Sequence, residues 1–168
     1  MELKKFFLEQ LETEAAASRK AVERVPEGHD AWKPHAKSME LGRLAALVAE
    51  MPGWVVLMLD RDRLDLDDPS SESLRTKPAA NKAELIAKLD RAVAAARAAL
   101  EATTEEHLHG HWGFAMGGQV ISGGPRYAML SSALFSHLAH HRGQLTVYLR
   151  LLEAKVPALY GPSADEAV

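Results

Sequence analysis

The sequence predicts an all-α protein built from four long helices. Apolar residues recur at three- and four-residue spacing in four stretches, and segments rich in glycine, proline or serine separate them. The chain has 168 residues with 47% apolar content, which suffices for one domain that buries about 70% of its unfolded surface. We therefore expect residues 1–168 to form a single helical domain.

Composition narrows the classes of protein and partner. The chain contains no cysteine, so any transition metal must be held by nitrogen and oxygen atoms. A formal charge of −3 gives no broad basic field for binding nucleic acid. The N-terminus is charged from its second residue, and no stretch approaches the roughly 18 to 20 apolar residues of a membrane span. We expect a cytoplasmic protein that binds neither nucleic acid nor membranes.

The first two helices are predicted in the N-terminal third. Apolar residues recur at helical spacing over residues 3–25, and Pro26 ends that run. Ser38 stands where an N-cap would precede the second apolar stripe, over residues 41–58. Pro52 lies inside this stripe. Because proline removes a backbone donor and clashes with the preceding turn, we expect the second helix to be kinked there.

A long connection precedes the third helix. Residues 61–80 are acidic, then rich in serine and proline, and they predict a solvated crossover loop. Asn81 and Glu84 have the spacing of a capping box. The apolar period that follows predicts a third helix that continues to Leu100.

The segment before the fourth helix is glycine-rich. Its composition predicts an ordered loop with a short two-stranded ribbon near residues 112–124. His107, His109 and His111 alternate at its start, and alternate residues of an extended strand share one face. These histidines would then form a cluster, although we favour ordinary exposed loop residues.

The fourth helix carries two histidines on its apolar face. At 100° per residue, His137 and His141 fall within the apolar face of residues 130–152, whereas His140 points toward another helix or solvent. Residues at i and i+4 have Cβ atoms about 6 Å apart, close enough for two imidazoles to bind one ion about 2.1 Å from each nitrogen. The same spacing also suits neutral core histidines that bond to carbonyls or to Gln144.

These residues resemble a family signature. His137 is followed by the run His141-Arg142-Gly143-Gln144 and by the tail of residues 156–166, and the segments 34–54 and 117–126 add two further matches. Together they resemble the DinB/YfiT-like superfamily over most of the chain. The resemblance implies a four-helix bundle in up-down-down-up order, with a long crossover between the second and third helices and homodimers in many members.

The resemblance also implies a metal site. Family members hold nickel or zinc with three histidines, two on the fourth helix and one on the second. Carried over, the fourth-helix ligands are His137 and His141, and the second-helix position is Leu47. A leucine offers no lone pair, so the expected site is incomplete, and Glu50 is the candidate for a third ligand.

Two functions follow from this incomplete site. The first is a metal-dependent activity, of thiol S-transferase or hydrolase type and using a low-molecular-weight thiol, impaired by Leu47. The alternative is a non-catalytic dimeric bundle that binds a small ligand or a protein partner, so whether the protein is an enzyme stays open, and no catalytic or substrate-binding residue is assigned. We expect Arg142 to pair with a carboxylate of a neighbouring helix rather than with an anionic substrate, and Val156, Leu159 and Tyr160 to fold back on the helices.

Overall fold

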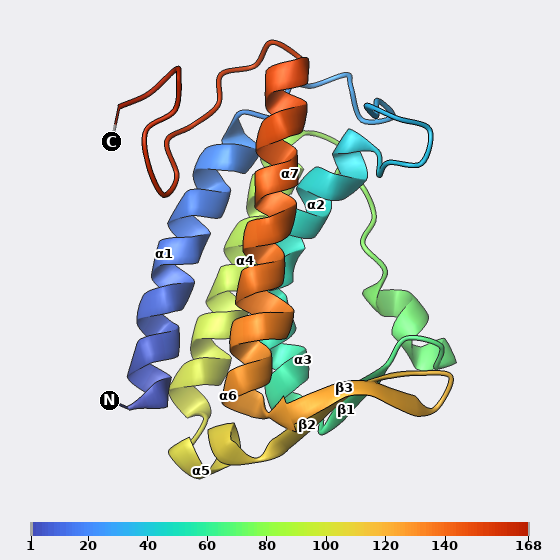
Figure 1. Cartoon of the computed structure of the whole chain (residues 1–168), viewed down its shortest axis with the longest axis vertical. Helices are drawn as coiled ribbons and strands as arrows, with labels where there is room; N and C mark the ends of the chain where they lie inside the picture. Colours follow the sequence, from blue (N-terminus) through green and yellow to red (C-terminus); the bar gives the residue numbers. More distant parts are fainter. Residues whose placement is uncertain (1, 168) are drawn as a thin grey trace.

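Four long helical stretches lie side by side in the computed structural model, which describes residues 2–167 apart from the side chains of residues 70 and 73 (Figure 1). They are α1 (Leu3–Glu23), α2 (Leu41–Glu50) with α3 (Trp54–Asp60), α4 (Lys82–Ala102), and α6 (Arg126–Met129) with α7 (His137–Leu151). The colours of Figure 1 run upward along α1 and α7 and downward along α2, α3 and α4.

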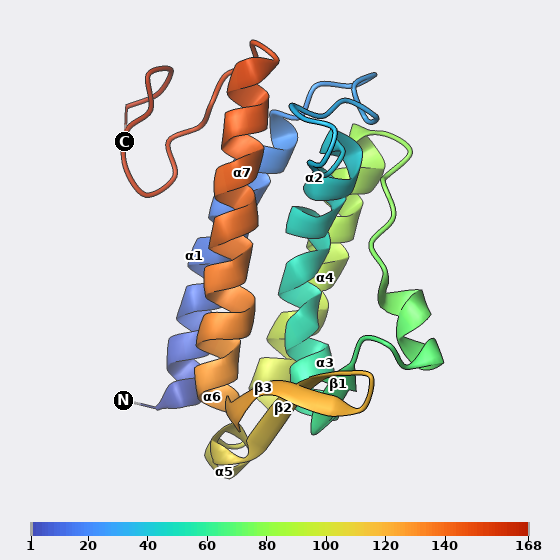
Figure 2. The same ribbon diagram turned by 45° about the vertical axis from the view of Figure 1, so that its right-hand side comes forward.

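Shorter elements gather at the lower end of these helices. They are α5 (Glu105–His109) and the strands β1 (Arg63–Asp65), β2 (His111–Met116) and β3 (Gln119–Pro125), and a short 3-10 helix covers Pro69–Leu74. Figure 2 shows the strands lying across the foot of α3 and α6. The protein is therefore mostly helical with a small three-stranded sheet. The prediction of an all-α fold with a short two-stranded ribbon did not include the third strand, β1.

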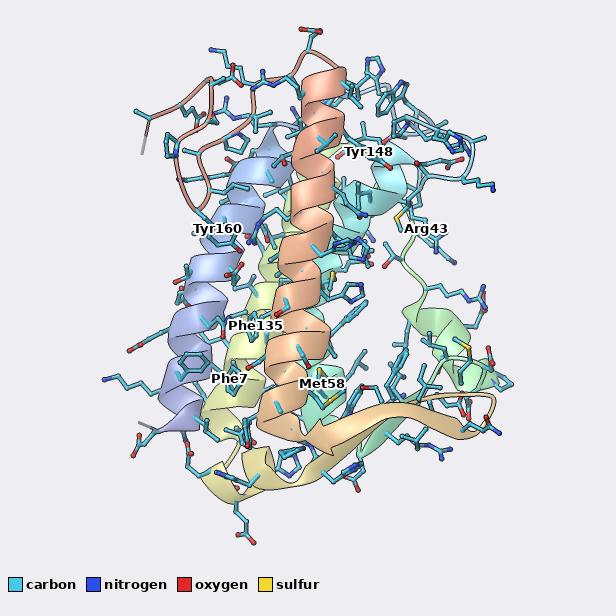
Figure 3. All side chains as sticks on the ribbon, viewed as in Figure 1. Phe7, Arg43, Met58, Phe135, Tyr148 and Tyr160 are labelled. Carbon is cyan, nitrogen blue, oxygen red and sulfur yellow. The ribbon has the colours of Figure 1, made fainter. Side chains whose placement is uncertain are left out.

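The first helix packs its predicted apolar face into the core. Phe7 and Leu11 are buried, and the Phe7 ring stacks on Phe135 of the fourth stretch with centroids 6.0 Å apart (Figure 3).

The start of α1 is fixed by a side chain far along the chain. The backbone N–H groups of Leu3 and Lys4 donate to the carboxylate of Glu105, at 3.1 and 2.9 Å.

The second helix begins later than the sequence predicts. Ser38 does not cap it, because α2 starts at Leu41 and no side chain caps its first turn. Backbone carbonyls of the preceding loop replace the cap: Leu41 N–H donates to the Trp32 carbonyl at 2.8 Å, and Gly42 N–H donates to the Asp30 carbonyl at 2.9 Å. The loop that precedes the helix thus accepts the hydrogen bonds that an N-cap side chain would otherwise accept.

The predicted interruption of this helix is confirmed. A 3-10 turn, Met51–Gly53, separates α2 from α3 and holds Pro52 at its second position. Contrary to our expectation, Leu41–Asp60 is long and apolar enough to cross a membrane by length and composition alone. Most of its most apolar window, 61%, is buried against the other helices, and a core helix of a soluble protein passes the same test.

The crossover loop is more structured than predicted. It contains β1 and the 3-10 helix, and β1 pairs in parallel with β2, with Leu64 opposite Phe114. The two-stranded ribbon is confirmed, since β2 and β3 form an antiparallel hairpin. Its turn uses Gly117 and Gly118, whose φ angles of 58° and 82° favour glycine. The strand β1 is only three residues long, so the alternation of apolar and polar residues in it is too short to predict a strand.

The predicted cap of the third helix by Asn81 is confirmed, and the reciprocal bond of the capping box is shifted by one residue, to Ala80. Asn81 Oδ1 accepts a hydrogen bond from Glu84 N–H at 2.9 Å, and the Glu84 carboxylate accepts one from Ala80 N–H at 2.6 Å. The helix then buries Leu85, Leu89, Ala96 and Leu100. An N-cap of this kind stabilises a helix by about 1 kcal/mol.

The fourth stretch contains a feature that the sequence did not predict. Residues Leu130–Ser136 form a π-helix between α6 and α7, and such segments are frequent at functional sites. Past it, the most buried stripe of α7 is Leu138, Arg142, Leu145 and Leu149. His137 and His141 lie one residue to the side of this stripe and are half-buried, and His140 is exposed.

Candidate functional site

His137 and His141 face each other at the start of α7. Their Nε2 atoms are 2.8 Å apart and their ring centroids 4.5 Å apart. The other ring nitrogen of each histidine has its own partner, because His141 Nδ1 lies 2.8 Å from Gln144 Oε1 and His137 is hydrogen-bonded to the backbone of Ala133. These outer contacts fix the orientation of both rings.

The histidine pair is neutral at neutral pH. Burial lowers the pKa of His137, and the charge of a protonated His141 lowers it further. Burial also lowers the pKa of His141, although its hydrogen bond to Gln144 opposes this shift. When both Nδ1 atoms donate, the two Nε2 lone pairs face each other. Such an arrangement attracts a proton, a cation or a hydrogen-bond donor of a ligand.

The described residues bring two of the three metal ligands together. No group of three histidine, cysteine, aspartate or glutamate side chains within residues 2–167 is placed to hold one ion. Leu47 packs against the core, and Glu50 Oε1 accepts from Lys88 Nζ at 2.5 Å. Glu50 is therefore engaged by Lys88 and is not grouped with the histidine pair among the described residues. The residues present do not fit the three-histidine site that the resemblance implies.

A cavity of about 540 Å³ adjoins the histidine pair. It lies between the sheet, α3 and the π-helical stretch, and His137 is part of its wall. Most of the wall is apolar, with Trp54, Leu57, Met58, Trp112, Phe114 and Met129 among its side chains. Figure 3 labels Met58 near the lower end of α3. Volume and lining are typical of pockets for small molecules.

Trp54 links the cavity to the histidines. Its ring meets His137 edge-on, with centroids 5.9 Å apart and planes at 60°. Trp112, which also lines the cavity, is 3% exposed, and its indole N–H has no acceptor within the described part of the chain. The cavity thus has two tryptophans and one imidazole in its wall.

The loop histidines do not join this site. His107 and His109 lie on α5, whereas His111 opens β2, so the three do not share one strand face, which was the less favoured interpretation. His109 and His111 are exposed, as the favoured interpretation expects, although His109 belongs to a short helix and not to a loop. The Thr104 side chain caps α5 by accepting from His107 N–H at 3.1 Å, which explains why a helix forms here. His107 Nε2 contacts the Leu59 carbonyl at 2.8 Å, and His109 Nδ1 contacts the Glu105 carbonyl at 2.8 Å. The His107 ring fastens α5 to α3, whereas the His109 contact stays within α5.

Arg142 forms the structural pair that the sequence favours. It is fully buried and contacts the Glu14 carboxylate on α1, and its Nη1 donates to Ser18 Oγ at 3.0 Å. The hydroxyl of Tyr160 bonds to both Arg142 and Glu14, so the C-terminal tail folds back on α1 as predicted (Figure 3). This network lies on the α1 side of α7.

No local pattern in the sequence points to most of the cavity wall. Leu64 and Phe114 stand on different strands, and Met129 stands on α6, so no local period connects them. The one available signal was the aromatic pair Trp112 and Phe114, which alternates along a predicted ribbon and therefore shares one face.

The comparisons with known proteins agree with this architecture. The profile of the DinB family matches residues 2–167. The chain belongs to the DinB family. A crystal structure of a DinB-like protein from Bacillus subtilis is similar to it, with a TM-score of 0.65 and 18% identity over 89% of this chain and 94% of that one. At this identity the likeness shows the DinB-like fold alone. The comparison with curated proteins gives no match.

Proposed function

We propose that this DinB-family protein binds a small, mostly apolar molecule in the cavity beside the histidine pair. The observation that carries the proposal is the cavity of about 540 Å³, whose wall is apolar except for a few groups such as His137. Ligand pockets combine such a wall with a small number of placed polar groups. The neutral imidazoles would accept a hydrogen bond from a hydroxyl, amine or thiol of the ligand.

Its scaffold, we infer, is the up-down-down-up four-helix bundle that the resemblance implies, and the helix directions in Figure 1 support this order. The homodimer, the low-molecular-weight thiol and the cytoplasmic location stay predictions. The metal-dependent enzyme and the non-catalytic bundle both stay predictions.

Binding of an uncharged aromatic probe tests the proposal. N-Phenyl-1-naphthylamine becomes fluorescent in apolar sites, and we expect it to bind the parent protein. Ala133 lies in the cavity wall, so Ala133→Leu fills part of the cavity and is expected to weaken binding about fivefold or more. Ala98→Leu, at an exposed position of α4, is the matched control. Equal affinity in both variants would contradict the proposal.

A second candidate function is binding of nickel or zinc at the histidine pair. It is favoured by the approach of the two Nε2 atoms to 2.8 Å and by the partners that orient both rings. Two imidazoles alone hold a divalent ion weakly, since protein sites for zinc use at least three ligands. The metal-dependent activity would then be impaired in this chain, as Leu47 implies.

Repair of the missing ligand tests this second candidate. We expect Leu47→His to bind nickel about tenfold or more tightly than the parent in isothermal titration. His137→Ala, introduced into that variant, should remove the gain. If Leu47→His binds no better than the parent, the histidine pair is not the remnant of a three-histidine site.

A further inference from the structure

A second hollow lies beside the cavity and differs from it in charge. It has a volume of about 510 Å³ and lies between α3, α4 and the segment that follows the 3-10 helix of the crossover. Its wall contains three cationic side chains, Arg75, Lys77 and Lys88, against one carboxylate, Glu50. We call it the basic groove.

The basic groove and the apolar cavity share part of their walls. Trp54, Leu57 and Leu74 line both. Trp54 also contacts His137, so a single tryptophan borders the cavity, the groove and the histidine pair. The two hollows therefore adjoin at these three side chains.

Part of the positive charge in the groove is available to a ligand. Lys88 is held by Glu50 at 2.5 Å, with both side chains partly buried. Arg75 pairs with Glu72 at 2.7 Å, but both side chains are about 70% exposed, and such exposed pairs contribute little. Lys77 is exposed and has no carboxylate within ion-pair distance among the residues that the structure describes.

We propose that the ligand is an organic anion with an apolar, ring-bearing body, whose acidic group binds Arg75 and Lys77. The body occupies the apolar cavity against Trp54, and the carboxylate, sulfonate or phosphate reaches the basic groove. Arginine and lysine both bind such groups through charge-assisted hydrogen bonds. This inference rests on the proposed function, because it names the chemical class of the molecule that the cavity takes.

A pair of fluorescent probes that differ by one charged group tests the inference. 8-Anilinonaphthalene-1-sulfonate is N-phenyl-1-naphthylamine with an added sulfonate. We expect the sulfonate probe to bind the parent more tightly, and this preference to weaken as the ionic strength rises. The double variant Arg75→Gln, Lys77→Gln should bind the sulfonate probe about three- to tenfold more weakly and the uncharged probe unchanged.

Two further variants separate the outcomes. Lys5→Gln with Lys37→Gln removes the same charge from exposed positions outside both hollows, so it should leave both affinities unchanged. Ala133→Leu should weaken both probes. Thermal unfolding checks that each variant is folded, and all four charged positions are exposed.

The outcomes distinguish the two proposals. If the Arg75 and Lys77 variant loses affinity for the sulfonate probe alone, the anion inference is supported. If that variant binds the sulfonate probe like the parent while Ala133→Leu weakens both probes, the anion inference is overturned and the cavity proposal stands. If Ala133→Leu weakens neither probe, the cavity proposal is overturned, and the anion inference with it.

Discussion

His141 and Arg142 are neighbours on α7, yet they belong to two different regions of the molecule. Arg142 is fully buried and reaches α1, where a carboxylate, a carbonyl, a serine hydroxyl and a tyrosine hydroxyl surround it. His141 is half-buried, and its Nε2 faces the imidazole of His137, which lines the cavity. Successive residues of a helix point 100° apart, so Arg142 contacts α1 and stabilises the fold, whereas His141 points toward the site.

The two regions differ in how many of their polar atoms have hydrogen-bond partners. The guanidinium of Arg142 uses both terminal nitrogens in hydrogen bonds to α1 or the tail, and within the described chain only its buried Nε lacks a partner. Such a network leaves no room for a ligand. Within the part of the chain that the structure describes, the two Nε2 atoms of the histidine pair contact each other and no backbone donor or carboxylate, next to a cavity of about 540 Å³. We expect stability to depend on the first region and binding on the second.

The largest effect is expected from Arg142→Met. This substitution leaves the Glu14 carboxylate, only 11% exposed, without its cationic partner. Breaking a buried ion pair from one side costs about 3–5 kcal/mol, so the free energy of unfolding in urea should fall by about that amount. Adding Glu14→Leu should recover much of the loss, because the unpaired charge is then gone. A loss below about 1 kcal/mol in the single variant would show that the pair does not hold the helices together.

Tyr160→Phe should have a smaller effect in the same region. The tyrosine hydroxyl donates to Glu14 Oε2 at 2.8 Å and accepts from Arg142. Its removal takes one partner from each but leaves the ion pair, so we expect a loss of about 1 kcal/mol in urea unfolding. Limited proteolysis of the tail should become faster, because Tyr160 is one of its attachments to α1. A variant as stable and as resistant as the parent would contradict this role.

The smallest effect on stability at neutral pH is expected from the histidine pair. Both pKa values are lowered in the folded state, mainly by burial, so below about pH 6.5 the unfolded chain binds protons that the folded chain does not. The free energy of unfolding should therefore fall as the pH drops from about 7 to about 5. The double variant His137→Gln, His141→Gln should lose less stability over that range. If the free energy of unfolding of the two proteins changes equally with pH, the lowered pKa values of the two histidines are contradicted.

Particular residues show how far the sequence alone could go. The helix starts and interruptions set by local chemistry were predictable: Asn81 with Glu84 caps α4, and Pro52 interrupts the second helical stretch. Ser38 failed as a cap because backbone carbonyls of a folded loop took its place. The two histidines were found by spacing, but their half-burial depends on packing next to the π-helical stretch Leu130–Ser136.

By itself the sequence determined the long helical stretches, the cap of α4 and the juxtaposition of His137 and His141, because these depend on contacts within a few residues. The family signature added that the scaffold is DinB-like. Only the tertiary structure decided that Arg142 meets Glu14, 128 residues away, and that two tryptophans from different segments enclose one cavity. Such contacts form where distant segments pack, so burial and pairing there follow from the assembled helices and not from any local period.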